Sequence, residues 1–496
     1  MSALDPITLQ VLTGALRATC EEMGAVLIRS AHSPNIKERR DCSTALFDPD
    51  GGMIMQAEHI PVHLGAMPAA VAAVAGRTHE RGQSWILNDP FAGGTHLPDI
   101  TVVTPAFDDA SNELLGFAAT RAHHADVGGP TPGSMPADSH TLTDEGVVIA
   151  PAVLTPALID ELVARMRRPD QRRADLRAQL AANRLGAQRL AEIAARIGPQ
   201  ALREATAEVA LYAERRMRAC LAALPDGTRH AVDVLEATGG DLELRLAATI
   251  AGDELTLDFT GSAAQHSGNL NAPLAVTVSS CLFAIRVLTD PDIPPSSGVL
   301  RPIHVIAPYG SLLNARAPAA VVAGNVETSS RVADLVLAAF GRALGQGTMN
   351  NLTLGTEEFT YYETLGGGQG ACSDADGPSA VHVAMSNTLN TPVEALELEY
   401  PLRVREYAVR RGSGGAGVHH GGDGVVREIE ALAPMAYSLI TERRRHAPPG
   451  AAGGMPGAVG RNLLNGEPLD PKSRGRLAPG DRLRLETPGG GGHGGP

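Results

Sequence analysis

The sequence predicts an α+β protein of several subdomains, with short antiparallel strands and hairpins, a central helical segment and a Gly-rich β-type C-terminal third. The chain has 496 residues, of which 43% are apolar, enough for a large core divided over more than one unit. Its 55 glycines and 35 prolines lack a collagen-like period and indicate many turns and short strands. Residues 155–224 are instead rich in Ala, Leu, Arg and Glu, a helical composition. We expect an N-terminal helix and hairpins in 1–150, helices in 151–227, mixed α/β structure in 228–345 and the Gly-rich β-type region in 346–496.

The first segment is expected to begin with a helix and to contain two hairpins. Residues 5–31 start with Asp-Pro, a helix-start signal, and carry apolar residues mostly three or four positions apart. Two strand-like runs, 42–47 and 53–57, flank an Asp-Gly turn and predict a hairpin. The runs 100–107 and 114–122 predict a second hairpin, with a short Ala- and Val-rich helix over 66–76 between the two.

Proline and glycine mark the boundaries of the later elements. Within 155–224, Pro169 and Gly198-Pro199 separate two or three helices. Residues 232–259 alternate apolar and polar side chains between Gly-containing turns, which predicts two or three antiparallel strands. Residues 274–290 and 328–345 are expected to be helical. The Gly-rich stretches of the last segment are expected to serve chiefly as turns between short strands.

Charge and composition exclude several classes of function. The formal net charge is −13, so the protein's own field opposes binding to nucleic acid or to an anionic membrane surface. The only lysines are Lys37 and Lys472, and neither ends a glycine-rich phosphate loop, so the chain is not a P-loop nucleotide hydrolase. No apolar run is long enough for a membrane span, and five scattered cysteines suit a reducing compartment. We therefore expect a cytoplasmic enzyme with no nucleic-acid or membrane partner.

Histidines are concentrated in the first third, since eight of the 16 lie between positions 32 and 140. If the second hairpin is centred near residue 110, His96 lies opposite His124 and Asp99 lies opposite Arg121 at its open end. Adjacent residues of an extended chain point to opposite faces, so only one of His123 and His124 is expected to face this site.

The first hairpin brings a further carboxylate to the same region. Its expected register places Asp41 opposite Glu58 and His59, just before His63. Imidazole and carboxylate ligands together suit Zn, Mn or Fe, and so small a ligand set leaves positions open for water or substrate. The alternative is a group of histidines that only form hydrogen bonds in the core or at the surface.

Three residues are candidates for catalysis rather than for metal binding. His59 and His63 follow the first hairpin directly and bring imidazoles toward the expected site. Glu327, within residues 325–329, offers a carboxylate on what is predicted as a catalytic loop. The same segment is equally a helix-start signal, because a helix-like run follows it.

Further motifs extend along almost the whole chain. They are Ser33–Ser43, His59–His63, Asn88–Pro90, Gly94–Asp99, Arg121–Asp126, Asp258–Ser262, Gly324–Ser329, Asn390–Glu394, Gly453–Gly457 and Gly460–Asn462. With these motifs the chain resembles the hydantoinase B/oxoprolinase family. That family contains the B-type subunits of ATP-dependent N-methylhydantoinases and 5-oxoprolinases, with acetone carboxylase and caprolactamase subunits as relatives.

The resemblance implies an enzyme subunit that works with an A-type partner, which binds ATP and Mg and phosphorylates an amide or carbonyl oxygen. The B-type subunit would hold a divalent metal, Zn, Mn or Fe, and complete the hydrolysis of a small cyclic amide such as a hydantoin or 5-oxoproline. Carried over residue by residue, the family's metal ligands fall on Asp41, His96, Asp99 and one of His123 and His124.

Two alternatives to this function remain open. One is a subunit of an acetone or acetophenone carboxylase, and the other is a non-catalytic subunit that only organises the assembly. The sequence departs from the family pattern at Gln369, where tryptophan is usual, at Ala384, where a second histidine is common, and in the tail around His493. These departures bear on the substrate rather than on the family.

Overall fold

The computed structural model of the chain describes residues 5–57 and 60–495, and the first third forms a six-stranded antiparallel sheet. The strand order is β2-β1-β5-β4-β3-β6. The strands are β1 (Cys42–Phe47), β2 (Met53–Ala57), β3 (Trp85–Leu87), β4 (Asp99–Phe107), β5 (Leu114–His123) and β6 (Ala152–Val153). Both predicted hairpins are confirmed, because β1 pairs with β2 and β4 pairs with β5.

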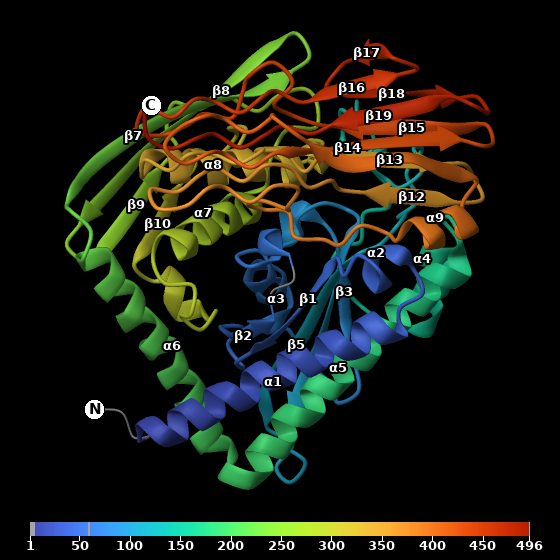
Figure 1. Cartoon of the computed structure of the whole chain (residues 1–496). Coiled ribbons are helices and arrows are strands. Elements are labelled where there is room, and N and C mark those ends of the chain that lie inside the picture. Colours follow the sequence, from blue (N-terminus) through green and yellow to red (C-terminus); the bar gives the residue numbers. More distant parts are fainter. Residues whose placement is uncertain (1–4, 58–59, 496) are drawn as a thin grey trace.

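Helices cover both faces of this sheet. The predicted N-terminal helix is confirmed as α1 (Pro6–Ser30), which lies beside α5 (Pro169–Ile197) across one face (Figure 1). The predicted short helix, α3 (Met67–Ala75), packs on the opposite face. In β1, Leu46 contributes to the core under α1 and Phe47 to the core under α3. Every residue of β1 is therefore buried.

The register of the second hairpin differs from the predicted one. Asp99 pairs with His123 and Thr101 pairs with Arg121, so the expected pairing of Asp99 with Arg121 is wrong by two residues. The pairs from Asp99–His123 to Ala106–Gly116 are centred on residue 111 rather than 110, and the strand pairing is irregular between Ala106 and Phe107. Because side chains alternate with a period of two, this shift leaves each side chain on the face where it was expected.

The central helical segment is confirmed as three helices, α4 (Pro156–Val163), α5 and α6 (Pro199–Ala222). Each begins with proline. An N–H at the first position of a helix has no intrahelical acceptor, so the N–H that proline lacks costs no hydrogen bond there. Between α5 and α6, Gly198 has a φ of 89°, a conformation that strains other residues. No helix within the described ranges is long and apolar enough to cross a membrane.

The next segment forms a four-stranded sheet of order β10-β9-β8-β7. The predicted antiparallel strands are β7 (Gly227–Ala237), β8 (Gly240–Ala251) and β9 (Glu254–Asp258), and a further strand, β10 (Ile303–Ile306), pairs in parallel with β9. Two predicted helices, α7 (Leu274–Leu288) and α8 (Ser329–Ala339), share the core of this sheet. A π-helical turn, Gly324–Thr328, precedes α8 directly.

Two more antiparallel sheets form the C-terminal segment, with orders β12-β11-β15-β18 and β13-β14-β19-β16-β17. The helix α9 (Val393–Glu399) packs beside β13, and the short helix α2 (Pro34–Lys37) precedes β1. The strands are β11 (Asn351–Gly355), β12 (Thr360–Glu363), β13 (Leu402–Arg410), β14 (Gly424–Ala431), β15 (Met435–Ile440), β16 (Arg461–Leu464), β17 (Glu467–Leu469), β18 (Lys472–Leu477) and β19 (Arg482–Glu486).

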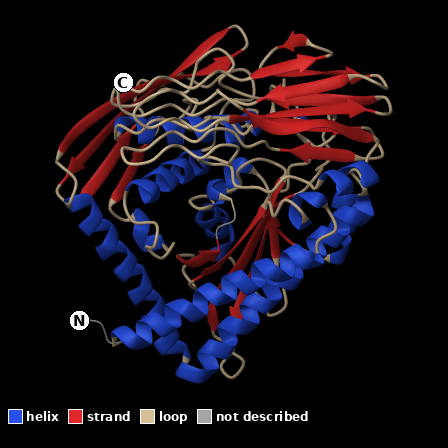
Figure 2. Ribbon diagram, viewed as in Figure 1, coloured by secondary structure: helices blue, strands red, loops and turns tan. Residues whose placement is uncertain are grey.

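The Gly-rich stretches of this segment do not serve chiefly as turns, so that prediction is wrong. Extended stretches within 366–370, 413–424, 450–457 and 489–494 are joined by backbone hydrogen bonds in a layer of loops beside the strands (Figure 2). Gly490 N, for example, donates to the carbonyl oxygen of Gly422 at 2.9 Å. A Cβ added at Gly490 would lie only 2.0 Å from the carbonyl oxygen of Gln369. Glycine is required because the backbones approach too closely for a side chain.

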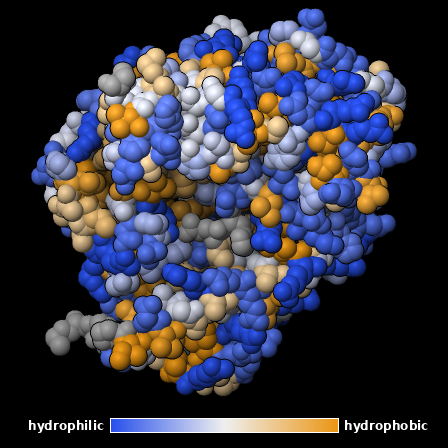
Figure 3. All heavy atoms as spheres, in the orientation of Figure 1, coloured by the Kyte–Doolittle hydropathy of each residue, from blue (hydrophilic) through white to orange (hydrophobic). Residues whose placement is uncertain are grey.

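The surface carries an apolar area at the end of the molecule where α1 begins (Figure 3). Ile7 is 76% exposed and Val11 is 65% exposed. Most of the remaining surface in this view is hydrophilic. An apolar area of this kind is typical of a surface that contacts another molecule.

Candidate metal centre

Two histidines and an aspartate meet at the open end of the β4–β5 hairpin. Asp99 is the first residue of β4 and pairs with His123, the last residue of β5. His96 lies in the turn before β4, where its carbonyl oxygen accepts the N–H of Asp99. Asp99 Oδ1 is 3.1 Å from His96 Nε2 and 3.2 Å from His123 Nδ1, and the two ring nitrogens are 3.2 Å apart. All three side chains are buried.

The donor set of this cluster fits a divalent transition metal. Ligand bonds of about 2.0–2.2 Å place neighbouring ligand atoms of one ion about 3 Å apart, as they are here. Burial lowers the pKa of His123, so its imidazole is neutral and offers a lone pair. Burial raises the pKa of Asp99, but the charges of His96 and His63 and the hydrogen bonds from His123 and His63 outweigh it, so this pKa lies well below its ordinary value. Neutral imidazole and ionised carboxylate are the forms that bind Zn, Mn or Fe.

His63 and Thr95 hold the second oxygen of Asp99. Thr95 Oγ1 donates to Asp99 Oδ2 at 2.7 Å, and His63 Nε2 lies 3.3 Å from the same oxygen. The other ring nitrogen of His63, Nδ1, is 3.0 Å from Ser43 Oγ. These contacts orient the carboxylate so that Oδ1 faces His96 and His123. The other candidate catalytic histidine, His59, lies outside the described residues.

The two remaining candidate ligands, Asp41 and His124, have different surroundings. Asp41 lines the same cavity as the cluster, its carbonyl oxygen accepts the N–H of His123 at 3.0 Å, and its Oδ2 is 4.0 Å from Arg39 Nη2. His124 faces α5 instead, with Nε2 at 2.9 Å from Gln179 Oε1. Of the adjacent histidines, His123 is therefore the one whose ring reaches the cluster.

Tyr362, on β12, supports the cluster from the C-terminal segment. Its ring stacks on that of His123, with centroids 4.7 Å apart and planes 11° apart. Its hydroxyl donates to Asn351 Oδ1 at 2.6 Å, and the guanidinium of Arg39 lies 4.6 Å from the centre of the ring. No motif pointed to Tyr362, and the only signal in the sequence is the rarity of aromatic residues, 3% of the chain.

A small cavity opens beside the cluster, and about 20 Å³ of its space is accessible to the centre of a water-sized molecule. Its lining combines the carboxylate and imidazole side chains of the cluster with hydroxyl, amide and apolar side chains. The lining residues are Asp41, Ile60, Val62, His63, His96, Asp99, His123, Asn325, Val326, Met349, Tyr362, Thr364, Met385, Ser386, Asn387 and Thr388. The cavity therefore joins the N-terminal hairpins to segments more than 200 residues away.

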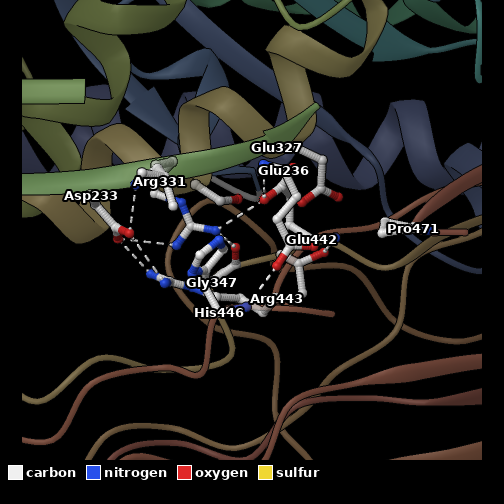
Figure 4. Close-up of polar contacts among 12 residues, drawn as sticks. Asp233, Glu236, Glu327, Arg331, Gly347, Glu442, Arg443, His446 and Pro471 are labelled. Carbon is white, nitrogen blue, oxygen red and sulfur yellow. Dashed lines mark hydrogen bonds and ion pairs between the residues drawn. The ribbon is translucent and has the colours of Figure 1, made fainter. Parts of the chain in front are cut away.

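Glu327 is not among the residues that line this cavity. It lies beside a buried group of ion pairs in which Arg331 and Arg443 both contact Asp233 and Asp334, while Arg331 also contacts Glu442 (Figure 4). Glu327 Oε1 accepts from Asn351 Nδ2 at 3.2 Å, and Asn351 in turn accepts from Tyr362. A chain of hydrogen bonds thus connects Glu327 to the tyrosine that stacks on His123.

We predict that Glu327 makes stability depend on pH. Burial, followed by the charge of Glu442, raises the pKa of Glu327 to about 8. The folded state therefore favours the protonated acid, and its contribution to stability falls as the pH rises from the ordinary carboxyl range through about 8. Between pH 5 and pH 9 this group should lower the free energy of unfolding of the wild type by on the order of a few kcal/mol, and Glu327→Gln should abolish that decrease. Chemical denaturation at both pH values measures this.

The exposed Glu358 provides the control for this prediction. Glu358→Gln should leave the wild-type dependence of stability on pH unchanged, because the side chain is exposed to solvent. Equal losses of stability between pH 5 and pH 9 in wild type and Glu327→Gln would contradict the prediction.

Comparisons with known proteins identify relatives along the whole chain. A family model described as hydantoinase B/oxoprolinase matches residues 5–496. The chain is 39% identical to 5-oxoprolinase 1 of Arabidopsis thaliana, over 99% of this chain and 42% of that protein. It is 37% identical to an uncharacterized protein of Methanocaldococcus jannaschii, over 99% of this chain and 91% of that protein. The chain thus spans less than half the length of the plant relative but most of the archaeal one.

Solved structures share the fold. The ATP-dependent caprolactamase from Pseudomonas jessenii matches with a TM-score of 0.93 and 28% identity, over 100% of this chain and 92% of that chain. A nucleotide-free structure of acetone carboxylase matches with a TM-score of 0.85 and 19% identity, over 99% of this chain and 76% of that chain. The second likeness concerns the fold alone. The expected α+β architecture of several small antiparallel sheets is confirmed.

Proposed function

This chain belongs to the hydantoinase B/oxoprolinase family, and from that premise we propose that it is the B-type subunit of an ATP-dependent cyclic-amide hydrolase. The substrate is a small cyclic amide such as 5-oxoproline or a hydantoin. The observation that carries the proposal is the buried cluster of His96, Asp99 and His123 on the wall of a small cavity. The relatives named 5-oxoprolinase and the structural likeness to an ATP-dependent caprolactamase support this reaction class.

The proposed metal ligands are His96, Asp99, His123 and Asp41. A bound Zn, Mn or Fe ion supplies Lewis-acid activation of a carbonyl oxygen or a water molecule. Asp99 provides an ionised carboxylate, and His63 acts through it by fixing the orientation of Oδ2. Because the cluster is buried, the surroundings screen these electrostatic interactions only weakly.

We assign Glu327 a positioning role in this mechanism. It holds Asn351 by one hydrogen bond, Asn351 holds the hydroxyl of Tyr362, and the ring of Tyr362 packs against His123. A fixed ring plane keeps Nδ1 of His123 directed at Asp99. The role proposed for Glu327 is therefore exerted through two other side chains.

An A-type partner that uses ATP and Mg is part of the proposal. The chain contains no phosphate-binding loop of the P-loop type, because its two lysines are not preceded by the required glycines. This chain covers only 42% of the length of 5-oxoprolinase 1, so such relatives have room for a further catalytic part. The apolar area around Ile7 and Val11 offers a surface for contact with another chain.

We predict that the chain hydrolyses no ATP alone and that, reconstituted with the A-type chain of the same organism, it opens a cyclic amide with concomitant ATP hydrolysis. Product formation from 5-oxoproline and from hydantoin, measured with and without ATP, tests this. Each chain assayed alone is the control. Carboxylation of a ketone with bicarbonate would favour the carboxylase alternative, and no turnover of any of these substrates with metal present would favour the assembly subunit. ATP hydrolysis by the purified chain alone would contradict the partner requirement.

A further inference from the structure

A serine on the wall of the cavity pairs with a histidine that is not itself part of the lining. Ser386 lines the cavity and is only 5% exposed. His382 Nδ1 lies 2.5 Å from Ser386 Oγ. A turn closed by the bond from Ser386 N to the carbonyl oxygen of Val383 brings the two side chains together. Neither residue belongs to the cluster of His96, Asp99 and His123.

The surroundings of His382 determine which of its ring nitrogens carries the proton. Its second nitrogen, Nε2, is buried and has no hydrogen-bond partner among the residues that the structure describes. A buried N–H without an acceptor costs more than a buried lone pair without a donor, so the proton belongs on Nδ1. Burial and the charge of Arg39 lower the pKa of His382 to about 4, so the ring is neutral and carries a single N–H.

This tautomer orients the hydroxyl of Ser386. With Nδ1–H donating to Ser386 Oγ, the oxygen acts as the acceptor of this bond and its own hydrogen remains available to another partner. Among the hydroxyls that line the cavity, those of Thr364 and Thr388 are 2.6 Å apart and both accept from Arg39 Nη2. Ser386 is thus a hydrogen-bond donor whose orientation is fixed by a residue behind it.

The same cavity also presents a buried acceptor. Asn325 Oδ1 lies on the cavity wall, and none of the described parts of the chain, 5–57 and 60–495, gives it a hydrogen-bond partner. A secondary cyclic amide carries one carbonyl acceptor and one N–H donor on adjacent atoms. The available donor of Ser386 and the acceptor of Asn325 complement that pair of groups.

We propose that Ser386, oriented by His382, donates a hydrogen bond to the carbonyl oxygen of the cyclic amide bound in the cavity. Ser386 is then a residue that contacts substrate, and His382 is a positioning residue that acts through it. The inference rests on the proposed function for the identity of the substrate. It adds the group that recognises the amide beside the metal ligands.

Steady-state kinetics of the reconstituted enzyme with 5-oxoproline test this contact. Ser386→Ala should raise KM about 10- to 100-fold while kcat changes much less, because the bond is made to bound substrate as well as in the transition state. Ser386→Thr keeps the hydroxyl and should restore most of the affinity. His382→Leu should raise KM, and His382→Asn, which keeps a side-chain N–H, should raise it less. Metal content should equal that of wild type in all four variants.

Wild-type KM in Ser386→Ala, or loss of bound metal from that variant, would overturn the inference. Nitrogen-15 NMR of histidine-labelled protein, with His382→Asn used to assign the signal, tests the orientation without any substrate. A proton on Nδ1 of His382 supports the inference, and a proton on Nε2 overturns it. If wild type turns over no cyclic amide, the proposed function and the substrate named here both fail, whereas the NMR result still decides how Ser386 is oriented.

Discussion

Replacing His96 or His123 by alanine is expected to lower turnover of the cyclic amide by at least about 1000-fold. The reason is that Lewis-acid activation is worth several kcal/mol in the transition state and is lost with the ion. Bound Zn, Mn or Fe should fall well below one ion per chain in these variants and in Asp99→Asn, which keeps the size of the side chain. Stability should change less than activity, because the cluster is small compared with the surrounding core. Elemental analysis and thermal melting of the same preparations measure both effects.

His124 provides the matched control for the proposed metal ligands. It is adjacent to His123 and equally buried, but its ring contacts Gln179 on α5. His124→Asn should therefore keep the wild-type ratio of metal to folded protein. The wild-type measurement requires purification without chelators and without a nickel column. If wild type contains no transition metal and added Mn or Zn does not raise activity with the partner, the cluster is a hydrogen-bonded substrate pocket instead.

Gly490→Ala is expected to destabilise the fold by roughly 3 kcal/mol or more, with loss of soluble protein. The new Cβ would lie 2.0 Å from the carbonyl oxygen of Gln369, and this neighbour is backbone held in the layer of Gly-rich segments. The clash cannot be relieved by rotating a side chain, so segments of the layer must separate. Soluble yield and Tm of the purified variant measure the effect.

Gly14→Ala is the control for this substitution. Gly14 lies within α1, and apart from the adjacent backbone of that helix no described residue has an atom within 4 Å of a Cβ added there. The change should be neutral or should stabilise the protein by about 0.5–1 kcal/mol, because alanine loses less backbone entropy in a helix. A Tm for Gly490→Ala equal to that of wild type would show that the layer tolerates a side chain.

The local elements could be predicted because their signals lie within a few residues of one another. Proline at the start of α5 and α6, and the Asp-Gly turn between β1 and β2, act on the adjacent backbone and need no distant partner. The sequence also predicted that His96 and Asp99 lie close to one of His123 and His124. Although the expected register was wrong by two residues, a shift of two keeps side chains on the same face.

Only the tertiary structure decided the residues that complete the cavity. The choice between His123 and His124 depends on which face of β5 packs against α5, where Gln179 contacts His124. Tyr362 and Ser386 reach the cavity from the C-terminal segment, and no short-range pattern links them to a hairpin more than 200 residues earlier.

The Gly-rich stretches illustrate the same division. The sequence alone determined that these stretches lack side chains at many positions and that their backbones can adopt many conformations. This freedom predicted turns. In the structure the glycines allow separate stretches to pack backbone against backbone. Local sequence determines which conformations a backbone can adopt, but the need for a glycine here comes from neighbouring segments that only the assembled fold brings within van der Waals contact.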